Sequence, residues 1–165
     1  MGLFQKLFRK EETKSYAVYA PACGTAKTLK ELGDGVFSEG ILGPGCIIEA
    51  KDGRIVAPVA GIITLAAETG HAIGITSDDG LEILIHVGID TVEMKGEGFD
   101  VRVTAGQKVQ PGDLLLNFDR EAVHKAGYID TVVVLITNGN EVGEVELTVQ
   151  GEIAEKDSLL KVTAK

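Results

Sequence analysis

Two of the three histidines of the chain lie in one stretch, ETGHAIGITSDDGLEILIHVGID, residues 68–90. His71 and His86 stand in apolar, strand-like sequence on either side of the turn-forming segment SDDG. Each imidazole carries a donor and an acceptor that need partners, so burying two rings on one face is costly unless they have a function. Thr69 stands two residues before His71, where its hydroxyl can bond an imidazole nitrogen and fix the tautomer. We therefore predict a functional histidine pair.

The length of the turn decides whether the two rings meet. A two-residue loop at Asp78 and Asp79 places His71 directly opposite His86, and a loop at Asp79 and Gly80 places the two rings diagonally. Both registers put the histidines on one face, with Cβ atoms about 4.5–5.5 Å apart for a direct pair and about 7–8 Å apart for a diagonal pair. A three-residue loop would put them on opposite faces. The predicted pair therefore depends on a two-residue loop.

A phosphohistidine relay is the first chemistry that suits such a pair, because neutral imidazole is a good nucleophile near neutral pH. The sequence has no Lys or Arg between Arg54 and Lys95, although several carboxylates lie there. The positive charge that stabilises a transferring phosphoryl group would therefore have to come from a partner protein.

Two other chemistries use the same stretch. The two histidines and Asp90 could supply three metal ligands, but His86 and Asp90 lie about 13 Å apart if they belong to one straight strand. Lys95 follows a Met, as does the lysine that biotinyl domains modify, but Gly96 stands where those domains have a second Met. The metal and carrier hypotheses are therefore weaker than the relay. His124 stands in polar sequence, and we expect it on the surface.

The elements that must hold this site are predicted to be strands. From residue 16 onward, short runs of Val, Ile and Leu alternate with Gly, Pro and Asp, which is typical of an all-β sandwich or barrel. Helical periodicity is limited to the N-terminal segment and to residues 120–126. The motif APACG at 20–24 recurs as APVAG at 57–61, which indicates a duplicated β motif.

Length and composition limit the function classes. The chain has 165 residues, enough for one domain, which we place at residues 16–165. A formal net charge of -9 argues against nucleic acid as a ligand. Cys23 and Cys46 belong to no CxxC motif, so we expect free thiols in a reducing compartment. No apolar run approaches the roughly 18–20 residues that span a bilayer, and no signal peptide is evident. We therefore expect a soluble, cytoplasmic protein.

Residues 1–15 are predicted to form a flexible amphipathic tail. Four apolar side chains share one stripe of a helix, with basic residues beside them: Leu3, Phe4, Leu7 and Phe8, flanked by Lys6, Arg9 and Lys10. So short a helix is marginal without a surface to lie on, so we expect either a disordered start or a weak contact with anionic membrane lipid.

The segment APVAGIITLAAETGHAIGITSDDGLEILIHVGIDTVEMKGEGF, followed by AGQKVQPGDLLLNFD, resembles the glucose-type enzyme IIA of the bacterial phosphoenolpyruvate-dependent sugar phosphotransferase system. The resemblance runs from about residue 18 to the C-terminus, and the spacing of TGHA, HVGIDTV and KGEGF makes it specific. The MGLFQKLF start is similar to that of free-standing members. The resemblance implies an antiparallel β-sandwich built as a duplicated barrel-sandwich hybrid motif, in agreement with the repeated motif.

The resemblance also implies phosphoryl transfer through a transient phosphohistidine. His86 matches the phosphorylated histidine of the family, His71 its companion that contacts the phosphoryl group, and Thr69 the threonine that orients the companion. Family members receive phosphate from the histidine-containing phosphocarrier protein and pass it to a cysteine of the IIB domain of a sugar permease. Val36, Phe37 and Asp90 match the docking face of relatives, and we add Glu93 because its charge lies beside Asp90.

The chain departs from enteric relatives at four positions where they carry Phe, namely Ala67, Ile73, Leu84 and Val87. Regulated permeases and kinases, which are further partners of those relatives, therefore remain an open expectation for this chain. The same relatives share a zinc ion between the two histidines and a partner carboxylate, so zinc at His71 and His86 is an optional ligand and no metal is required. A regulatory module that no longer relays phosphate and a zinc hydrolase are the alternative functions.

Overall fold

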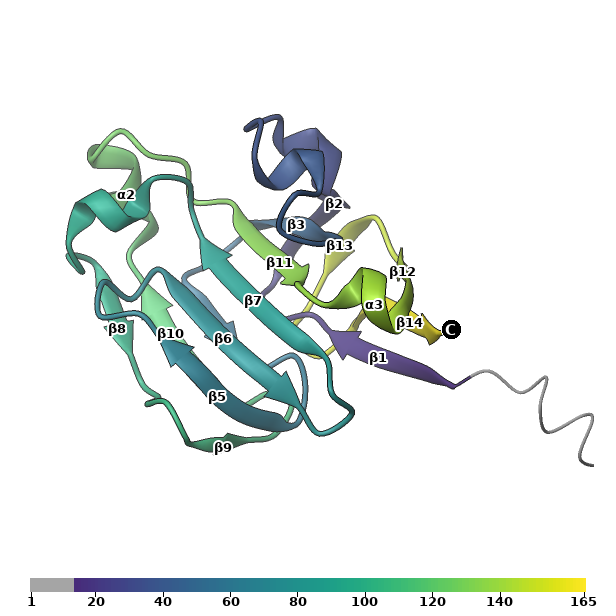
Figure 1. Cartoon of the computed structure of the whole chain (residues 1–165). Helices are drawn as coiled ribbons and strands as arrows, with labels where there is room; N and C mark the ends of the chain where they lie inside the picture. The colour runs from purple at the N-terminus through teal and green to yellow at the C-terminus, as the bar shows by residue number, and fades with distance from the viewer. Residues whose placement is uncertain (1–13) are drawn as a thin grey trace, which may run out of the picture.

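The computed structural model describes residues 14–165, which form mostly antiparallel strands (Figure 1). The predicted all-β class is confirmed. Short helical turns connect some strands: η1 (Leu29–Leu32), η2 (Phe37–Glu39), η3 (Thr91–Met94), α2 (Arg120–Lys125) and α3 (Gly139–Val142). The helix expected at 120–126 is α2. Most of the predicted N-terminal tail lies outside the described residues, and Ser15, which we placed in the tail, is the first residue of strand β1 (Ser15–Tyr19).

The largest sheet has the strand order β13-β2-β3-β11-β7-β6-β5-β9. Its strands are β2 (Gly24–Thr28), β3 (Gly45–Ala50), β5 (Gly61–Ala66), β6 (Ala72–Ser77), β7 (Glu82–Val87), β9 (Lys108–Val109), β11 (Val132–Ile136) and β13 (Gly151–Ile153). Two smaller sheets have the orders β1-β14-β12 and β4-β10-β8. Their remaining strands are β4 (Arg54–Val56), β8 (Phe99–Val101), β10 (Leu114–Phe118), β12 (Gly143–Leu147) and β14 (Ser158–Ala164).

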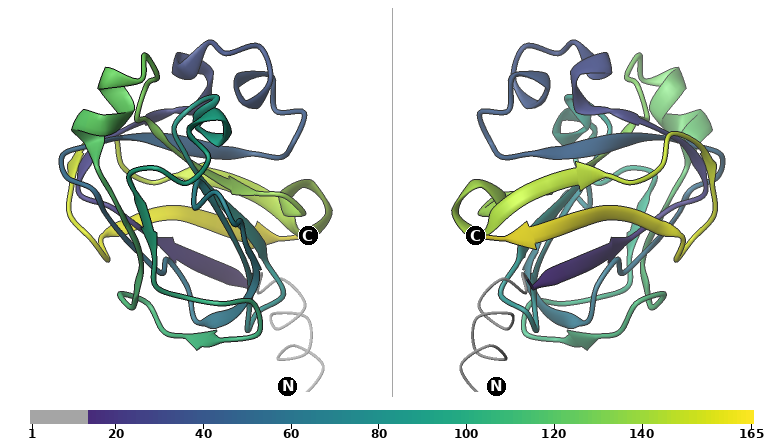
Figure 2. Two further views of the ribbon diagram at one scale, coloured as in Figure 1. Left: turned by 90° about the vertical axis from the view of Figure 1, so that its left-hand side faces the viewer. Right: turned by 90° about the vertical axis from the view of Figure 1, so that its right-hand side faces the viewer.

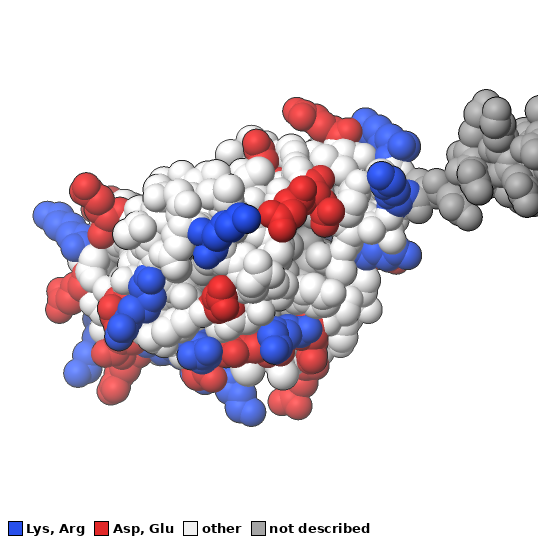
Figure 3. All heavy atoms as spheres, turned by 90° about the horizontal axis from the view of Figure 1, so that it is seen from below, with Lys and Arg blue, Asp and Glu red and all other residues white. Residues whose placement is uncertain are grey.

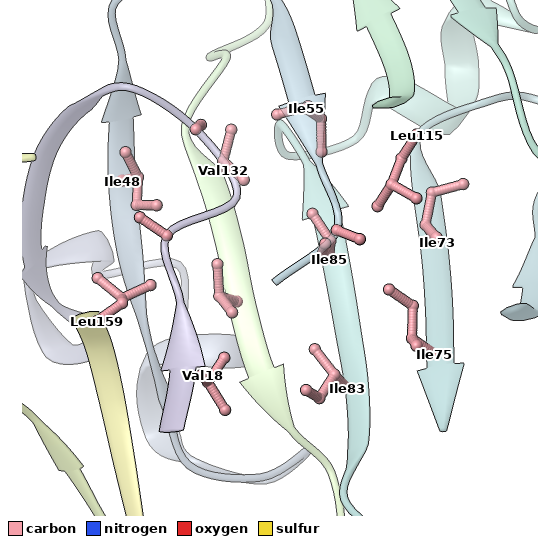
Figure 4. Packing of buried hydrophobic residues seen from close by; sticks show 14 of the residues in the cluster. Val18, Ile48, Ile55, Ile73, Ile75, Ile83, Ile85, Leu115, Val132 and Leu159 are labelled. Carbon is pink, nitrogen blue, oxygen red and sulfur yellow. The ribbon is translucent and has the colours of Figure 1, made fainter. Parts of the chain in front are cut away.

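The main core lies between these sheets. Successive side chains of a strand point to opposite faces, so each strand turns every second side chain toward the core. In β7, Ile83, Ile85 and Val87 are buried, whereas His86 is partly exposed on the opposite face. The two side views show the β1-β14-β12 sheet packed as a layer against the larger sheet (Figure 2). Branched aliphatic side chains from both layers, including Val18 of β1, meet in the interior (Figure 4).

Strand β11 is buried on both faces, since all five of its residues are buried. Its outer face is covered by η1 and η2, whose Leu29 and Phe37 form a second apolar cluster with Val133 and Leu135. The η1 and η2 turns lie at the end of the molecule toward which β7 runs (Figure 1). This covering segment therefore brings residues 29–39 close to the end of β7.

The predicted duplication is visible in the hydrogen bonds between the repeated motifs. Tyr19 N–H donates to Pro58 C=O at 2.9 Å, and Val56 N–H donates to Pro21 C=O at 2.8 Å. Residues 19 and 21 correspond to residues 56 and 58 in the repeat, so exchanging the two motifs reproduces both bonds. The two copies thus lie against each other with local two-fold symmetry.

The same symmetry extends to a second pair of segments that the sequence comparison missed. Ala20 N–H donates to Asp157 C=O and Ala57 N–H donates to Asp113 C=O, at 2.7 and 2.8 Å. Each aspartate closes its own turn, because its carboxylate accepts a hydrogen bond from the N–H three residues earlier, at Ala154 and Gln110. The turns share little sequence beyond this Asp and the leucines that follow, which explains why the repeat was not detected there.

The hairpin of β6 and β7 contradicts both registers predicted from its turn. Ala72 lies opposite His86, and the loop between Ser77 and Leu81 has three residues, Asp78, Asp79 and Gly80. Gly80 has a φ of 90°, the left-handed conformation that completes a three-residue hairpin loop. A two-residue loop was expected because the Asp-Gly pair usually forms its tip, whereas here Gly80 takes the third position. Strand alternation alone would therefore place His71 and His86 on opposite faces.

Candidate functional site

The two histidines nevertheless meet, because His71 lies outside the strand. Strand β6 begins at Ala72, and His71 occupies the bend before it, so the alternation of β6 does not direct its side chain. The ring centroids of His71 and His86 lie 4.9 Å apart, with an angle of 77° between the ring planes. The predicted pair is present, but a bend produces it and the hairpin register does not.

The ring of His86 is oriented by the backbone that follows it. Its Nδ1 atom lies 2.7 Å from the carbonyl oxygen of Gly88. Because a carbonyl can only accept a hydrogen bond, Nδ1 must carry the proton, which leaves Nε2 of the neutral ring with a free electron pair. Gly88 has a φ of 76°, and a Cβ atom there would lie 2.4 Å from the Thr91 methyl group and 2.6 Å from the Ile129 carbonyl oxygen. Only glycine fits this position.

Thr69 contacts His71 as predicted, with its hydroxyl oxygen 2.5 Å from Nδ1. The Nδ1 atoms of both rings are thus hydrogen-bonded within the chain, and the two Nε2 atoms remain for chemistry. The backbones of the histidine segments are also joined, since Val87 N–H donates to His71 C=O at 2.7 Å.

Burial keeps both rings neutral. Desolvation lowers the pKa of His71 below its usual value near 6.5. For His86, burial lowers the pKa and the proximity of His71 adds to this effect, whereas the hydrogen bond to Gly88 and the charges of Asp90 and Asp34 oppose it, and the net direction is downward. A neutral His86 at physiological pH has the free Nε2 electron pair that a nucleophile needs.

A hollow of about 300 Å³ opens beside His86. Its lining combines apolar side chains with two carboxylates: Asp34, Val36, Phe37, His86, Ile89, Asp90 and Val92. The ring of Phe37 is buried, and its centroid lies 5.0 Å from that of His86, whereas Val36 is 48% exposed. Three predicted docking residues, Val36, Phe37 and Asp90, therefore line the hollow. Glu93 does not, and instead lines a neighbouring groove between η3 and α2.

Asp34 is a site residue that the sequence reasoning missed. Its two carboxylate oxygens accept hydrogen bonds from the backbone N–H groups of Phe37 and Ser38, at 3.0 and 2.9 Å. Desolvation raises the pKa of Asp34, but these bonds outweigh it and hold the pKa below the usual value. Asp34 is followed directly by Gly35 and stands three residues before Phe37. An Asp in such a position often accepts hydrogen bonds from the next backbone N–H groups, and this local signal could have identified it.

The remaining titratable candidates lie elsewhere. His124 is on the surface as predicted, with Nε2 3.2 Å from a carboxylate oxygen of Asp130. Among residues 14–165, no three His, Cys, Asp or Glu side chains form a cluster able to hold a metal. A zinc ion on the two Nε2 atoms would therefore need further ligands from water or a partner to reach four.

Residues 16–142 match the family described as phosphoenolpyruvate-dependent sugar phosphotransferase system, EIIA 1. The chain belongs to this EIIA family. It is 42% identical over 146 residues to the beta-glucoside-specific EIIBCA component of Bacillus subtilis and 41% identical over 145 residues to the glucose-specific EIICBA component of Streptococcus pneumoniae. Each alignment covers 88% of this chain but only 24% and 20%, respectively, of the relative.

A solved structure agrees with the fold. The glucose permease IIA from Mycoplasma capricolum superposes with a TM-score of 0.81 at 37% identity, over 90% of this chain and 96% of that one. This EIIA chain is therefore a β-sandwich component of a sugar phosphotransferase system.

None of the helices in residues 14–165 has the length and apolar character needed to cross a bilayer. On the face seen from below in Figure 1, the described basic side chains lie among acidic ones and form no continuous basic patch (Figure 3).

Proposed function

We propose that His86 accepts a phosphoryl group from the histidine-containing phosphocarrier protein and passes it to a cysteine of a IIB domain during sugar uptake. The observation that carries this proposal is the hydrogen bond between His86 Nδ1 and the Gly88 carbonyl. It fixes the tautomer in which Nε2 has the free electron pair, and it holds the ring in one orientation before a partner arrives.

The transfer can proceed without net proton movement. Nε2 of His86 forms a bond to phosphorus while the bond between phosphorus and the donor nitrogen breaks, and the electron pair of that bond returns to the donor ring. His86 retains its Nδ1 proton against Gly88, so the product ring is a cation next to the phosphoryl group. A donor phosphohistidine protonated on its other nitrogen leaves as neutral imidazole.

His71 is proposed to stabilise the phosphoryl oxygens. If the Thr69 hydroxyl donates to His71 Nδ1, the neutral ring carries its proton on Nε2 and can donate a hydrogen bond to the transferring group. Thr69 would then act by selecting this tautomer. Zinc remains optional in this proposal, because binding through both Nε2 atoms would require the other tautomer of His71, in which Nδ1 donates to the Thr69 hydroxyl oxygen.

The docking partner must supply positive charge. The hollow next to His86 contains Asp34 and Asp90 and no Lys or Arg. A basic side chain of the phosphocarrier would neutralise these carboxylates and the transferring phosphoryl group together. The relatives named EIIBCA and EIICBA carry the B, C and A designations in one component, which supports a IIB domain as the phosphate acceptor.

Incubation of the chain with phosphoenolpyruvate, enzyme I and the phosphocarrier protein tests this proposal. We expect the intact mass to increase by one phosphoryl group and the phosphopeptide to contain His86. Omission of the phosphocarrier should abolish the increase. A phosphopeptide that maps to His71 or His124, or an unchanged mass, would show the proposal to be wrong.

A further inference from the structure

Thr91 is a buried polar residue to which the proposed transfer assigns no role. It is one of three buried polar side chains in residues 14–165 and is fully inaccessible to solvent. Its hydroxyl donates to the carbonyl oxygen of Val87, four residues earlier, at 2.5 Å. Its methyl group lies over Gly88, where it would contact any added Cβ atom. Thr91 therefore contacts the two residues that directly follow His86.

The Thr91 hydroxyl is bonded to a carbonyl that an antiparallel ladder would normally use. Val87 and His71 lie where the register of β6 and β7 would form the next pair. Every second pair of an antiparallel ladder exchanges two backbone bonds, and this position is one of them, because it lies an even number of pairs from the hydrogen-bonded pair Ser77 and Leu81. One of the two bonds is present, from Val87 N–H to His71 C=O. The reciprocal bond, from His71 N–H to Val87 C=O, is not made, although a carbonyl oxygen can accept two hydrogen bonds; this oxygen accepts from the Thr91 hydroxyl, which belongs to the turn that follows β7.

Because the pair of His71 and Val87 lacks one of its two bonds, the ladder ends at Ala72, and the side chain of His71 does not follow the alternation of β6. With both bonds in place, β6 would extend to His71 and the side chain would point to the face opposite His86. The backbone after Val87 turns away through two left-handed residues, Gly88 and Asp90, with φ angles of 76° and 62°. This turn brings Thr91 back to Val87 and presents the Gly88 carbonyl to His86.

We propose that Thr91 is a positioning residue that ends the β6–β7 ladder at Ala72 and thereby places His71 beside His86. The inference rests on the proposed function for its catalytic consequence but not for its structural one. The hydroxyl is required for the bond to Val87, and the methyl group supports the Gly88 turn. Serine retains the first role and valine the second.

The test compares Thr91→Val with Thr91→Ser. Valine should slow phosphoryl acceptance by roughly tenfold to a hundredfold, the range expected when a catalytic group is misplaced by about 1 Å, and serine should stay within about threefold of wild type. Thr148→Val is the control, since the Thr148 hydroxyl also donates to a backbone carbonyl, that of Leu159, at 3.0 Å, but this carbonyl accepts the backbone N–H of Thr148 as well. It should leave the rate unchanged.

A spectroscopic arm separates this inference from the proposed function. In ¹⁵N-resolved NMR of the unphosphorylated protein, Thr91→Val should shift the ring nitrogens of both histidines and weaken the contacts between the rings, whereas Thr148→Val should not. In the wild type, amide exchange should be slow at Val87 and fast at His71. A protected His71 amide, or wild-type ring spectra in Thr91→Val, would overturn the inference even if phosphorylation proceeds. If the wild-type protein is not phosphorylated, but the wild-type amide exchange and the ring shifts of Thr91→Val are as expected, only the proposed function is contradicted.

Discussion

The hairpin of β6 and β7 has two ends that use their backbone groups differently. At the closed end, Ser77 N–H donates to Leu81 C=O and Gly80 N–H donates to Ser77 C=O, so backbone bonds within the hairpin close the loop. The serine side chain adds a further bond, from Leu81 N–H to its hydroxyl oxygen. Two further bonds tie this three-residue turn to neighbouring segments, since Asp78 N–H donates to Ala60 C=O and the Asn138 side chain donates to Gly80 C=O, both at 2.9 Å.

At the open end, two consecutive carbonyls bind side chains. The Val87 carbonyl accepts from Thr91, and the Gly88 carbonyl accepts from the ring of His86. The histidine pair therefore lies where the ladder stops, because a backbone carbonyl that the sheet does not use can orient the ring of His86 there. Matched changes at the two ends should therefore have different effects on transfer.

The largest effect is expected from the histidines themselves. His86→Ala should abolish phosphate acceptance because it removes the nucleophile, and His71→Ala should reduce the transfer rate by about 10²–10³ through lost stabilisation of the phosphoryl oxygens. Rapid-quench assays with phosphorylated phosphocarrier would measure both rates. His124→Ala should behave as wild type, and a similar loss in all three variants would refute the assignment.

Glycine replacements compare the two ends directly. Gly88→Ala should lower the free energy of unfolding by roughly 2–5 kcal/mol and strongly impair transfer, since it combines left-handed backbone strain with a clash against Thr91 and Ile129. Gly80→Ala has the same backbone strain, with a φ of 90°, but no atom within 4 Å of the added Cβ. It should cost only about 1 kcal/mol and leave transfer intact. Denaturant unfolding and transfer rates would check both, and equal losses of activity would contradict the comparison.

Removing one carboxylate charge at either end of the hairpin should distinguish an effect on docking from an effect of the net charge of the protein. Asp90→Asn should slow association with the phosphocarrier by about threefold to tenfold at low salt, and less as salt increases. Asparagine is the suitable substitution, because Asp90 has a φ of 62° and Asn tolerates this conformation. Asp79→Asn makes the same charge change at the closed end and should have little effect. Stopped-flow transfer across a salt series would measure this, and an Asp90→Asn rate equal to wild type at low salt would remove the electrostatic step.

The smallest expected effect is on stability as a function of pH. Burial lowers the pKa values of His71 and His86 in the folded state, so the unfolded chain binds more protons as the pH falls below its histidine pKa of about 6.5. This contribution to stability is complete above that pH and is lost as the pH falls toward the folded pKa values. Replacing both histidines by Gln should flatten denaturant-derived stability between neutral and mildly acidic pH, whereas His124→Gln should not. An unchanged slope in the double variant would be the contrary result.

Local sequence was sufficient to predict several features of this protein. Alternating apolar runs punctuated by Gly and Pro predicted the all-β class, because side-chain alternation and turn chemistry are local properties. The repeated motif at Ala20 and Ala57 predicted a duplication, and the hydrogen bonds between the copies confirm it. The spacing of Thr69 and His71 likewise predicted their contact, since residues two apart near a bend can meet without help from the rest of the fold.

Tertiary structure decided how the pair of histidines is assembled. The register prediction failed because it treated His71 as part of strand β6, which begins only at Ala72. The Val87 carbonyl opposite His71 accepts from the Thr91 hydroxyl and not from the His71 N–H. The Gly88 carbonyl acquires its role only because a left-handed turn aims it at His86. Phe37 reaches the same ring from a segment about 50 residues away, held by the carboxylate of Asp34. Residue types in the sequence specify which groups can react, but the backbone conformation at the end of the ladder specifies which of them meet.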